Sequence, residues 1–359
     1  MDTQILNLSS NLWKSTLQKL RHDIYHWPEY IKLEAQRTEY SPEAILIVDD
    51  DKIFFLPYLV RQCDRVSEQN IPEVFDVVSP YGYPGILLNE AASVTPTFIN
   101  SAINELTRIL RTKNVCSAFF RLHPILNQGL EEILNPAICQ ITGETVAIDL
   151  RISEAEMWQG TRRNQRQSIT KCKQAGFTAK MVPINLYLDK FVEIYQITMQ
   201  RVEAAQYYYS FNLEYLLNMA DALGEKMHLC LVELQDEIAS GGLYTECCGI
   251  VQSIFSATQN KFLKQSPNSL QIEYTRLWAK ERGNEILHLG GGVGCEKDSL
   301  FHFKSGFSKQ TQKYLTIRLI VDEEKYNYLV RLRAQYLNIE TEKLEKSKFF
   351  PAYRSSKLD

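Results

Sequence analysis

Short apolar strands and amphipathic helices alternate along this chain in two successive runs, and no other feature restricts its fold as much. In the first run, residues 44–48 and 53–60 flank the polar turn DDDK, a pattern that predicts a β-hairpin. Residues 97–111 carry apolar side chains at helical spacing and precede a predicted strand at 115–120. Hairpin strands mixed with helices predict an α/β (α+β) fold with mixed sheets.

The second run begins near residue 150 and contains the same kinds of element. A predicted helix at 162–174 is closed by Gly176, and another helix begins at Ser266-Pro267 with proline in its first turn. We therefore expect two similar halves, 1–150 and 151–322, followed by a charged helix and tail at 323–359. The second half also contains predicted helices at 186–201 and 212–223 and predicted strands at 228–234, 238–245, 250–258, 285–289 and 315–321.

Composition places the chain among globular proteins. Its 359 residues are 45% hydrophobic and 23% charged, which suffices for two folded halves. A net charge of -3 gives no global attraction for nucleic acid or anionic membranes, so an anion would need a local patch. The longest apolar run, 53–60, is too short for a membrane span. The N-terminus lacks signal-peptide features and the cysteines fit reduced thiols, so we expect a cytoplasmic protein.

The glycine-rich segment LGGGVG at residues 289–294 follows a predicted strand and precedes a predicted helix. Glycines in such a turn let backbone N–H groups approach a ligand closely, and Gly291 and Gly292 are candidates for this contact. Lys304 adds positive charge nearby. The spacing matches neither a Walker loop nor the dinucleotide-binding fingerprint. Two interpretations stay open, a ligand-binding turn and a tight turn packed against the core.

Basic and aromatic side chains supply the other candidates. Arg162 and Arg166 are four residues apart, so they are expected to share one helix face and to suit a phosphate or carboxylate. Tyrosines combine a flat apolar face with a hydroxyl group, which suits sugar or peptide ligands. The expected tyrosines are Tyr81 and Tyr83, in a segment stiffened by prolines, and Tyr207 and Tyr208, just after Arg201; His123 lies beside Arg121 in the segment RLHP.

Taken together, and in their order along the chain, these motifs resemble the FemABX-like group of the GNAT superfamily, whose members have two GNAT folds in one chain. The similarity covers roughly residues 40–320, and its most specific part is the block running from LGGG to FKSGF. It implies two tandem GNAT-like mixed-sheet domains packed together. The segments that carry the resemblance are 79–85, 121–124, 162–166 with Gly176, 198–201 with Tyr207-Tyr208, 266–269 and 289–307.

The resemblance implies an acyltransferase that moves an acyl or aminoacyl group to an amine. The implied acceptor is a cell-envelope precursor, either an amino sugar or a peptidyl nucleotide-sugar, as in polysaccharide or peptidoglycan synthesis. The chain has neither the helical arm of the bridge-forming members nor the glycine-rich pyrophosphate loop of simple GNAT enzymes. The donor therefore stays open between acyl-CoA and aminoacyl-tRNA, with tRNA a partner in the second case, and no metal is expected.

The same resemblance implies roles for individual residues. Lys304 matches a lysine that faces the acceptor phosphate, and Arg201 with Tyr207 or Tyr208 matches acceptor-binding positions. The transfer itself relies on positioning and on backbone N–H groups at a strand end, so Ser256 and Asn268, at and after the predicted strand 250–258, complete the expected site. No catalytic residue is assigned. One alternative is a non-catalytic binding module with this fold. A second alternative is a nucleotide-dependent ligase that uses the glycine cluster; it is disfavoured because no pair of metal-binding carboxylates accompanies the glycines.

Overall fold

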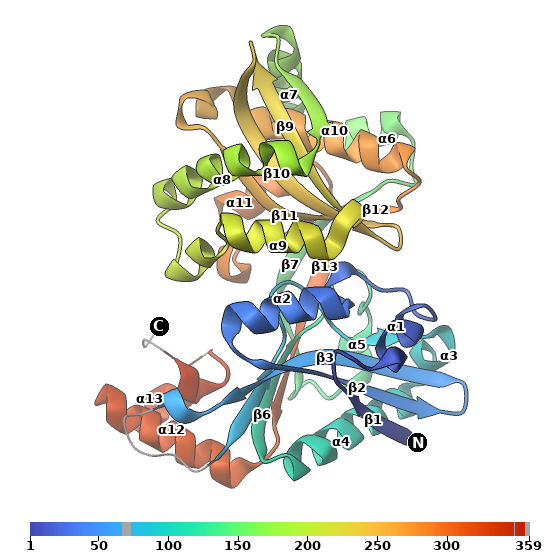
Figure 1. Ribbon diagram of the computed structural model, residues 1–359, viewed down its shortest axis with the longest axis vertical. Helices are drawn as coiled ribbons and strands as arrows, with labels where there is room; N and C mark the ends of the chain where they lie inside the picture. The colour runs from blue at the N-terminus through green and yellow to red at the C-terminus, as the bar shows by residue number, and fades with distance from the viewer. Residues whose placement is uncertain (67–72, 348, 356–359) are drawn as a thin grey trace. The chain divides into compact units, whose positions relative to one another are not determined.

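The computed structural model describes residues 1–66, 73–347 and 349–355, which form two compact units (Figure 1). Unit 1 comprises residues 1–142 and 314–359, and unit 2 comprises residues 143–313. These bounds differ from the expected division at 150 and 322, because the C-terminal segment belongs to the first unit. The expected tail includes residues 348 and 356–359, which lie outside the described residues.

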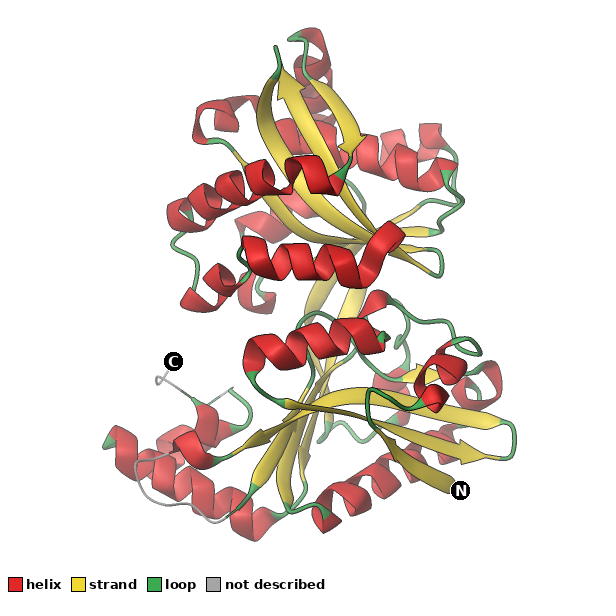
Figure 2. Ribbon diagram, in the orientation of Figure 1, coloured by secondary structure: helices red, strands yellow, loops and turns green. Residues whose placement is uncertain are grey.

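Unit 1 has strands in the order β1-β2-β3-β4-β6-β13, with helices on both faces (Figure 2). All neighbouring pairs are antiparallel except β4 and β6, which are parallel and are joined through α4. The bounds are β1 Asp2–Leu6, α1 Asn11–Leu17, α2 Pro28–Thr38, β2 Ser41–Asp49, β3 Lys52–Gln62, β4 Phe75–Val78, β5 Leu87–Leu88, α3 Glu90–Ser93, α4 Pro96–Thr112, β6 Val115–Arg121, α5 Leu130–Ile133, β13 Thr311–Ile320, α12 Glu323–Leu337 and α13 Thr341–Glu345.

Unit 2 repeats this plan, with strands in the order β8-β9-β10-β11-β12-β7. Here β11 and β12 are the parallel pair, joined through α10, and the other neighbours are antiparallel. The bounds are β7 Cys139–Asp149, α6 Glu154–Gly160, α7 Arg163–Gln174, β8 Thr178–Val182, α8 Ile184–Arg201, α9 Leu213–Leu223, β9 Met227–Leu234, β10 Glu237–Cys247, β11 Ile250–Thr258, α10 Pro267–Glu281, β12 Ile286–Gly290 and α11 Ser299–Lys304.

The last strand of each unit comes from the other part of the chain. β7 follows the first unit's elements but pairs with β12, whereas β13 follows the second unit's elements but pairs with β6. The chain therefore passes between the units within these two strands, at residues 142–143 and 313–314.

Each unit has its own core. In unit 1, α4 supplies Phe98, Ile103 and Leu106 to a cluster with β2, β3 and β6. In unit 2, α7 and α10 pack on the strands through a cluster that includes Ile169 and Leu270. Within the described residues, no helix is both long and apolar enough to cross a bilayer.

Most predicted elements are confirmed, including the hairpin of β2 and β3 and the helix closed by Gly176, whose φ is +87°. The charged helix expected from residue 323, which the sequence pattern extends to residue 346, is wrong as a single element. It ends at Leu337 because Asn338 adopts a left-handed conformation with φ +54°, and the short helix α13 follows. The strands β1 and β8 were not predicted.

Candidate active site

The parallel strands of unit 2 diverge toward their carboxyl ends. They pair only where residues 250–252 of β11 face 286–288 of β12. Beyond Gln252, the described pairing of β11 is with β10, and that of β12 beyond His288 is with β7. Because ligands of open α/β sheets bind at the carboxyl ends of strands where neighbours separate, this opening is the candidate active site.

The end of β11 is held by side chains from α8 and α10. The Thr258 hydroxyl donates to Asn268 Oδ1 at 2.8 Å, and the Thr198 hydroxyl donates to the Thr258 carbonyl at 3.3 Å. Arg201 donates to the same carbonyl at 2.9 Å and to Asn260 Oδ1 at 2.6 Å. Burial lowers the pKa of Arg201. The predicted residues Arg201 and Asn268 therefore meet at the end of β11.

The first turn of α10 adjoins the opening. Pro267 occupies the first helical turn, and the side chain of the N-cap residue, Ser266, makes no capping hydrogen bond. The first N–H groups of a helix lack intrahelical partners and carry partial positive charge, which suits an anionic group or a carbonyl oxygen. The predicted Ser256 is exposed on β11, opposite Gly242 of β10.

Gln165, a residue that sequence reasoning did not single out, connects three helices around this turn. Its Oε1 accepts from the Ser269 hydroxyl of α10 at 2.9 Å, and its Nε2 donates to the Phe303 carbonyl of α11 at 3.2 Å. Gln165 is buried within a helix that is otherwise strongly polar. Its place on the apolar stripe of α7, with Ile169 and Cys172, was the available signal.

Lys304 and the glycine turn lie together. The Lys304 ammonium donates to the Gly291 carbonyl at 2.7 Å. Burial lowers the pKa of Lys304 to about 8, against a smaller opposing effect of Asp298. The structure therefore brings Lys304 and Gly291 together, beside the buried end of β12.

The glycines of this turn also have steric reasons for their presence. Gly290 has a φ of +76°. A Cβ on Gly291 would lie 2.9 Å from the Glu144 carbonyl oxygen of β7, and a Cβ on Gly292 would lie 2.1 Å from the Glu296 carbonyl oxygen. The directions that side chains would take are thus filled by protein backbone, and the glycine pattern alone does not require a ligand.

Arg162 and Arg166 contact different helices. Arg162 precedes α7 and donates to the His302 carbonyl and the Ser305 hydroxyl, both at 3.3 Å. Arg166 donates to the Trp158 carbonyl of α6 at 3.5 Å. The two guanidinium groups do not form the single fork expected from their spacing, because Arg162 is the N-cap residue and not part of the helix. That they bind an anionic group stays a prediction.

Tyr207 and Tyr208 lie in a 3₁₀ turn, Gln206–Ser210, between α8 and α9. Tyr207 is 42% exposed and packs edge-on against Phe211, while the Tyr208 carbonyl accepts from the Tyr195 hydroxyl at 3.3 Å. Their predicted ligand contact stays a prediction.

The four candidates of unit 1 lie around the corresponding parallel pair, which does not open. Beyond the pairing of β4 with β6, the Ser79 N–H donates to the Phe119 carbonyl, and the Arg121 N–H donates to the Ser79 hydroxyl. The Arg121 guanidinium donates to the carbonyls of Ser79 and Pro80 at 3.0 and 2.9 Å. Arg121 thus closes this strand end.

His123 has structural partners. Its Nδ1 accepts from the N–H groups of Ile125 and Leu126, so the proton resides on Nε2, which donates to the Asp23 carboxylate at 2.9 Å. The Tyr81 N–H donates to Glu34, and the Tyr83 ring packs edge-on against Tyr314. The ligand contacts expected for Tyr81, Tyr83, Arg121 and His123 stay a prediction.

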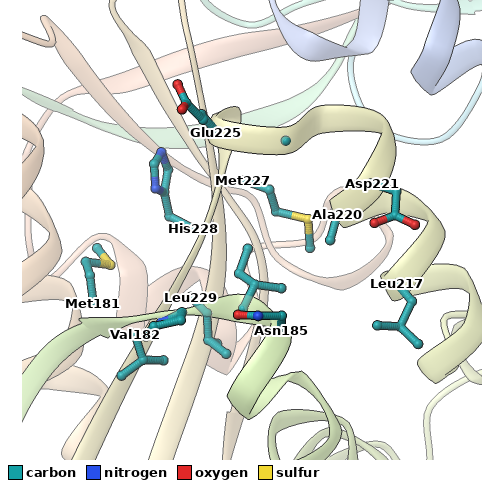
Figure 3. A pocket seen from close by; sticks show the side chains of 13 residues that line it. Met181, Val182, Asn185, Leu217, Ala220, Asp221, Glu225, Met227, His228 and Leu229 are labelled. Carbon is teal, nitrogen blue, oxygen red and sulfur yellow. The ribbon is translucent and has the colours of Figure 1, made fainter.

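A separate hollow of unit 2, of about 420 Å³, contains none of the predicted site residues (Figure 3). Apolar side chains such as Met181 and Leu217 line it, and Asp221, Glu225 and His228 lie around it. Met227, at its edge, pairs with Thr245 near the amino end of β11. The hollow therefore lies at the opposite end of the strands from the candidate active site.

The strand orders of both units and the diverging pair of unit 2 define the class of protein. The chain has a FemABX-like fold made of tandem GNAT-like mixed-sheet domains. Among the particular solved structures that it resembles is FemX, which is 13% identical and covers 91% of this chain and 99% of its own, with a TM-score of 0.68.

Two further structures share this fold. L-PGS from Bacillus licheniformis is 13% identical and covers 94% of this chain and 99% of its own, with a TM-score of 0.51. A conserved protein of unknown function from Bacteroides thetaiotaomicron is 12% identical, covers 88% and 99%, and has a TM-score of 0.53. No family model and no curated protein matches the sequence.

Proposed function

We propose that the protein is an acyltransferase that moves an acyl or aminoacyl group to an amine at the diverging strands of unit 2. The observation that carries the proposal is the opening between β11 and β12, with the uncapped N-terminus of α10 beside it. The FemABX-like fold supports the same reaction class.

The geometry suits a transfer that depends on positioning. An amine attacks the donor carbonyl, a C–N bond forms, the C–S or C–O bond of the donor breaks, and the amine proton leaves with the departing group or to water. Positioning of the reactants contributes about 7–11 kcal/mol to such reactions. Backbone N–H groups at the open end of β11 are suited to stabilise the oxyanion that develops on the carbonyl.

The donor of this proposal is an acyl-CoA or an aminoacyl-tRNA, and the acceptor is the amine of a cell-envelope precursor, an amino sugar or a peptidyl nucleotide-sugar. Both donors are anionic. The N-terminus of α10 would face this negative charge, while the half-buried Lys304 would face the acceptor phosphate.

The test combines a donor screen with the introduction of a negative charge at the N-terminus of α10. The full chain is incubated with labelled acyl-CoA and with aminoacyl-tRNA in the presence of amino-sugar and peptidyl nucleotides, and acylated products are detected by mass spectrometry. Asn268→Asp keeps the acceptor for Thr258 and favours the helix N-terminus electrostatically, but it repels an anionic donor. We expect at least tenfold slower transfer, with a melting temperature that is equal to that of the wild type or slightly higher.

Asn212→Asp is the matched control, because Asn212 caps a different helix of unit 2, α9, by accepting from the Tyr215 N–H. It should leave transfer unchanged. Donor binding without any product would instead favour a non-catalytic binding module. Full transfer activity in Asn268→Asp would remove the α10 N-terminus from the site.

A further inference from the structure

The outer face of α7 carries a row of cations beside Trp158 of α6, outside the candidate active site. We propose that this face binds the nucleotide portion of a ligand, with the base against Trp158 and the phosphates against Arg163, Arg166 and Lys171. Acyl-CoA and aminoacyl-tRNA both contain a nucleotide portion. Which of these donors the face binds rests on the proposed function.

Helix geometry separates this face from the packed face of α7. Gln165, Ile169 and Cys172 are buried against the core of unit 2. The remaining stripe follows the spacing of three and four residues that aligns side chains along one helix face. It consists of Arg163, Arg166, Gln167, Thr170, Lys171 and Gln174, which line a shallow hollow together with Trp158.

The cations of this face lack acidic partners among the described residues. The helix contains Arg163, Arg166, Lys171 and Lys173 and no acidic residue. Lys173 lies off this face and interacts electrostatically with Glu273 of α10, whereas the described ion pairs include none of the other three cations. Like charges at such spacing destabilise a helix. Elsewhere in unit 2, exposed cations such as Lys180 have carboxylate partners. The unbalanced charge on α7 therefore favours an anionic ligand over a merely solvated face.

The shape and the remaining side chains favour a nucleotide among anions. The hollow measures about 410 Å³, within the range of small-molecule sites. Half-buried Trp158 packs on the core with part of its surface and lines the hollow. Bases stack on exposed aromatic rings beside cationic side chains. Gln167, Thr170 and Gln174 supply hydrogen-bonding groups for a base edge or a ribose.

The cation row also has a length that suits a phosphate chain. Arg163 and Lys171 are eight residues apart, about 12 Å along the helix axis. Arg166 lies between them and is held near Trp158 through the carbonyl of that residue. The row therefore has room for separated phosphates, as in a nucleotide with two phosphate groups or an RNA strand.

The test measures binding directly and needs no transfer activity. The full chain is titrated with adenosine 3′,5′-bisphosphate and, separately, with a short single-stranded RNA, using intrinsic tryptophan fluorescence and anisotropy at several salt concentrations. In Arg163→Gln/Lys171→Gln, we expect at least tenfold weaker binding of the preferred probe. For RNA, the slope of log affinity against log salt should fall by about 0.7 for each phosphate that the variant no longer neutralises.

The control removes the same charge elsewhere. Lys190→Gln/Arg331→Gln changes two exposed cations outside α7 and should bind like the wild type. In Trp158→Phe, which keeps an aromatic ring in the packing, the ligand-dependent quenching of tryptophan fluorescence should be lost. Preferential binding of the bisphosphate would identify a small donor, and preferential binding of RNA would identify a tRNA donor; both support the site.

The proposal would be overturned if Arg163→Gln/Lys171→Gln bound each probe as tightly as Lys190→Gln/Arg331→Gln does. It would also be overturned if the wild type bound neither probe detectably. Melting temperatures of the variants establish that each is folded. A protein that binds nucleotides here but transfers nothing would refute the proposed function and leave this inference intact.

Discussion

Lys304 is half-buried, donates to the Gly291 carbonyl, and has a pKa lowered to about 8 by burial. At this pKa, its ammonium group is largely charged at neutral pH and loses its charge just above it. A charged group held at low hydration interacts strongly with an anion, which fits the predicted contact with an acceptor phosphate.

The lowered pKa makes a prediction about stability. Because the lysine has a higher pKa in the unfolded chain, the unfolded chain binds more protons than the folded one between about pH 8 and 10. The free energy by which this buried lysine destabilises the folded protein therefore falls as the pH rises. Between pH 7 and 10, the free energy of unfolding of the wild type should rise by up to about 3 kcal/mol relative to that of Lys304→Met. Urea denaturation at each pH measures this difference. A constant difference across this range would show that Lys304 titrates normally.

The glycine turn gives a second prediction for single residues. A Cβ at position 292 would overlap the Glu296 carbonyl and Asp298, whereas one at 291 would press on the Glu144 carbonyl at 2.9 Å. Gly292→Ala should therefore destabilise the protein by about 1–3 kcal/mol, and Gly291→Ala by less.

Gly160→Ala is the control for this series. A Cβ on Gly160 has no neighbour within 4 Å, so the variant should be neutral or slightly stabilising in chemical denaturation. If Gly292→Ala were as stable as Gly160→Ala, the turn would have room for a side chain and its glycines would need another reason.

At the scale of elements, α7, α10 and α11 are joined through one buried side chain. Gln165 contacts Ser269 near the start of α10 and the Phe303 carbonyl next to Lys304. The N-terminus of α10 and the lysine helix are thus positioned by the same residue. Motion of either helix would break a buried hydrogen bond.

We expect a coupling energy of about 1 kcal/mol between Gln165 and Ser269. Gln165→Leu should cost about 1–3 kcal/mol, because it leaves the Ser269 hydroxyl and the Phe303 carbonyl without this partner. A double-mutant cycle with Ser269→Ala, followed by urea denaturation, measures the coupling. Strictly additive effects would show that the hydrogen bond does not contribute to stability.

At the scale of the whole molecule, the two units exchange their last strands. Unit 1 needs β13 beside β6, and its C-terminal segment buries Leu329, Val330 and Tyr353 in a further core cluster. The Tyr353 hydroxyl also lies 2.7 Å from the Ser117 hydroxyl and donates to Asp76. The first unit is therefore complete only when its C-terminal residues, through Tyr353, have been made.

This topology predicts that a fragment of residues 1–150 does not fold by itself. It lacks the strand beside β6, and it lacks Tyr353 and Arg354, which contact Asp76, Cys63 and Cys116 in the whole chain. Circular dichroism and amide-proton NMR of the fragment should indicate an unfolded or aggregated chain, while co-expression with residues 151–359 should restore folding. A cooperatively folded 1–150 fragment would contradict the exchange of strands as a requirement for stability.

The sequence by itself determined the types of element, the mixed α/β class and the resemblance to FemABX-like proteins, because apolar periodicity and short motifs are local properties of the chain. It also placed Lys304 with the glycine turn and Asn268 close to the end of the strand that ends at Thr258. Local pattern could not show that Arg162 and Arg166 separate, since a single residue at a helix boundary decides that.

Only the tertiary structure decided which parallel pair opens. Both units contain a strand, a helix and a parallel strand, but Ser79 and Arg121 close the pair of unit 1, whereas β11 and β12 separate in unit 2. The exchange of β7 and β13 was likewise hidden, because strand partners far apart in sequence are chosen by the packing of the whole sheet. Long-range pairing, which local periodicity does not encode, thus determined where the sheet of this protein opens.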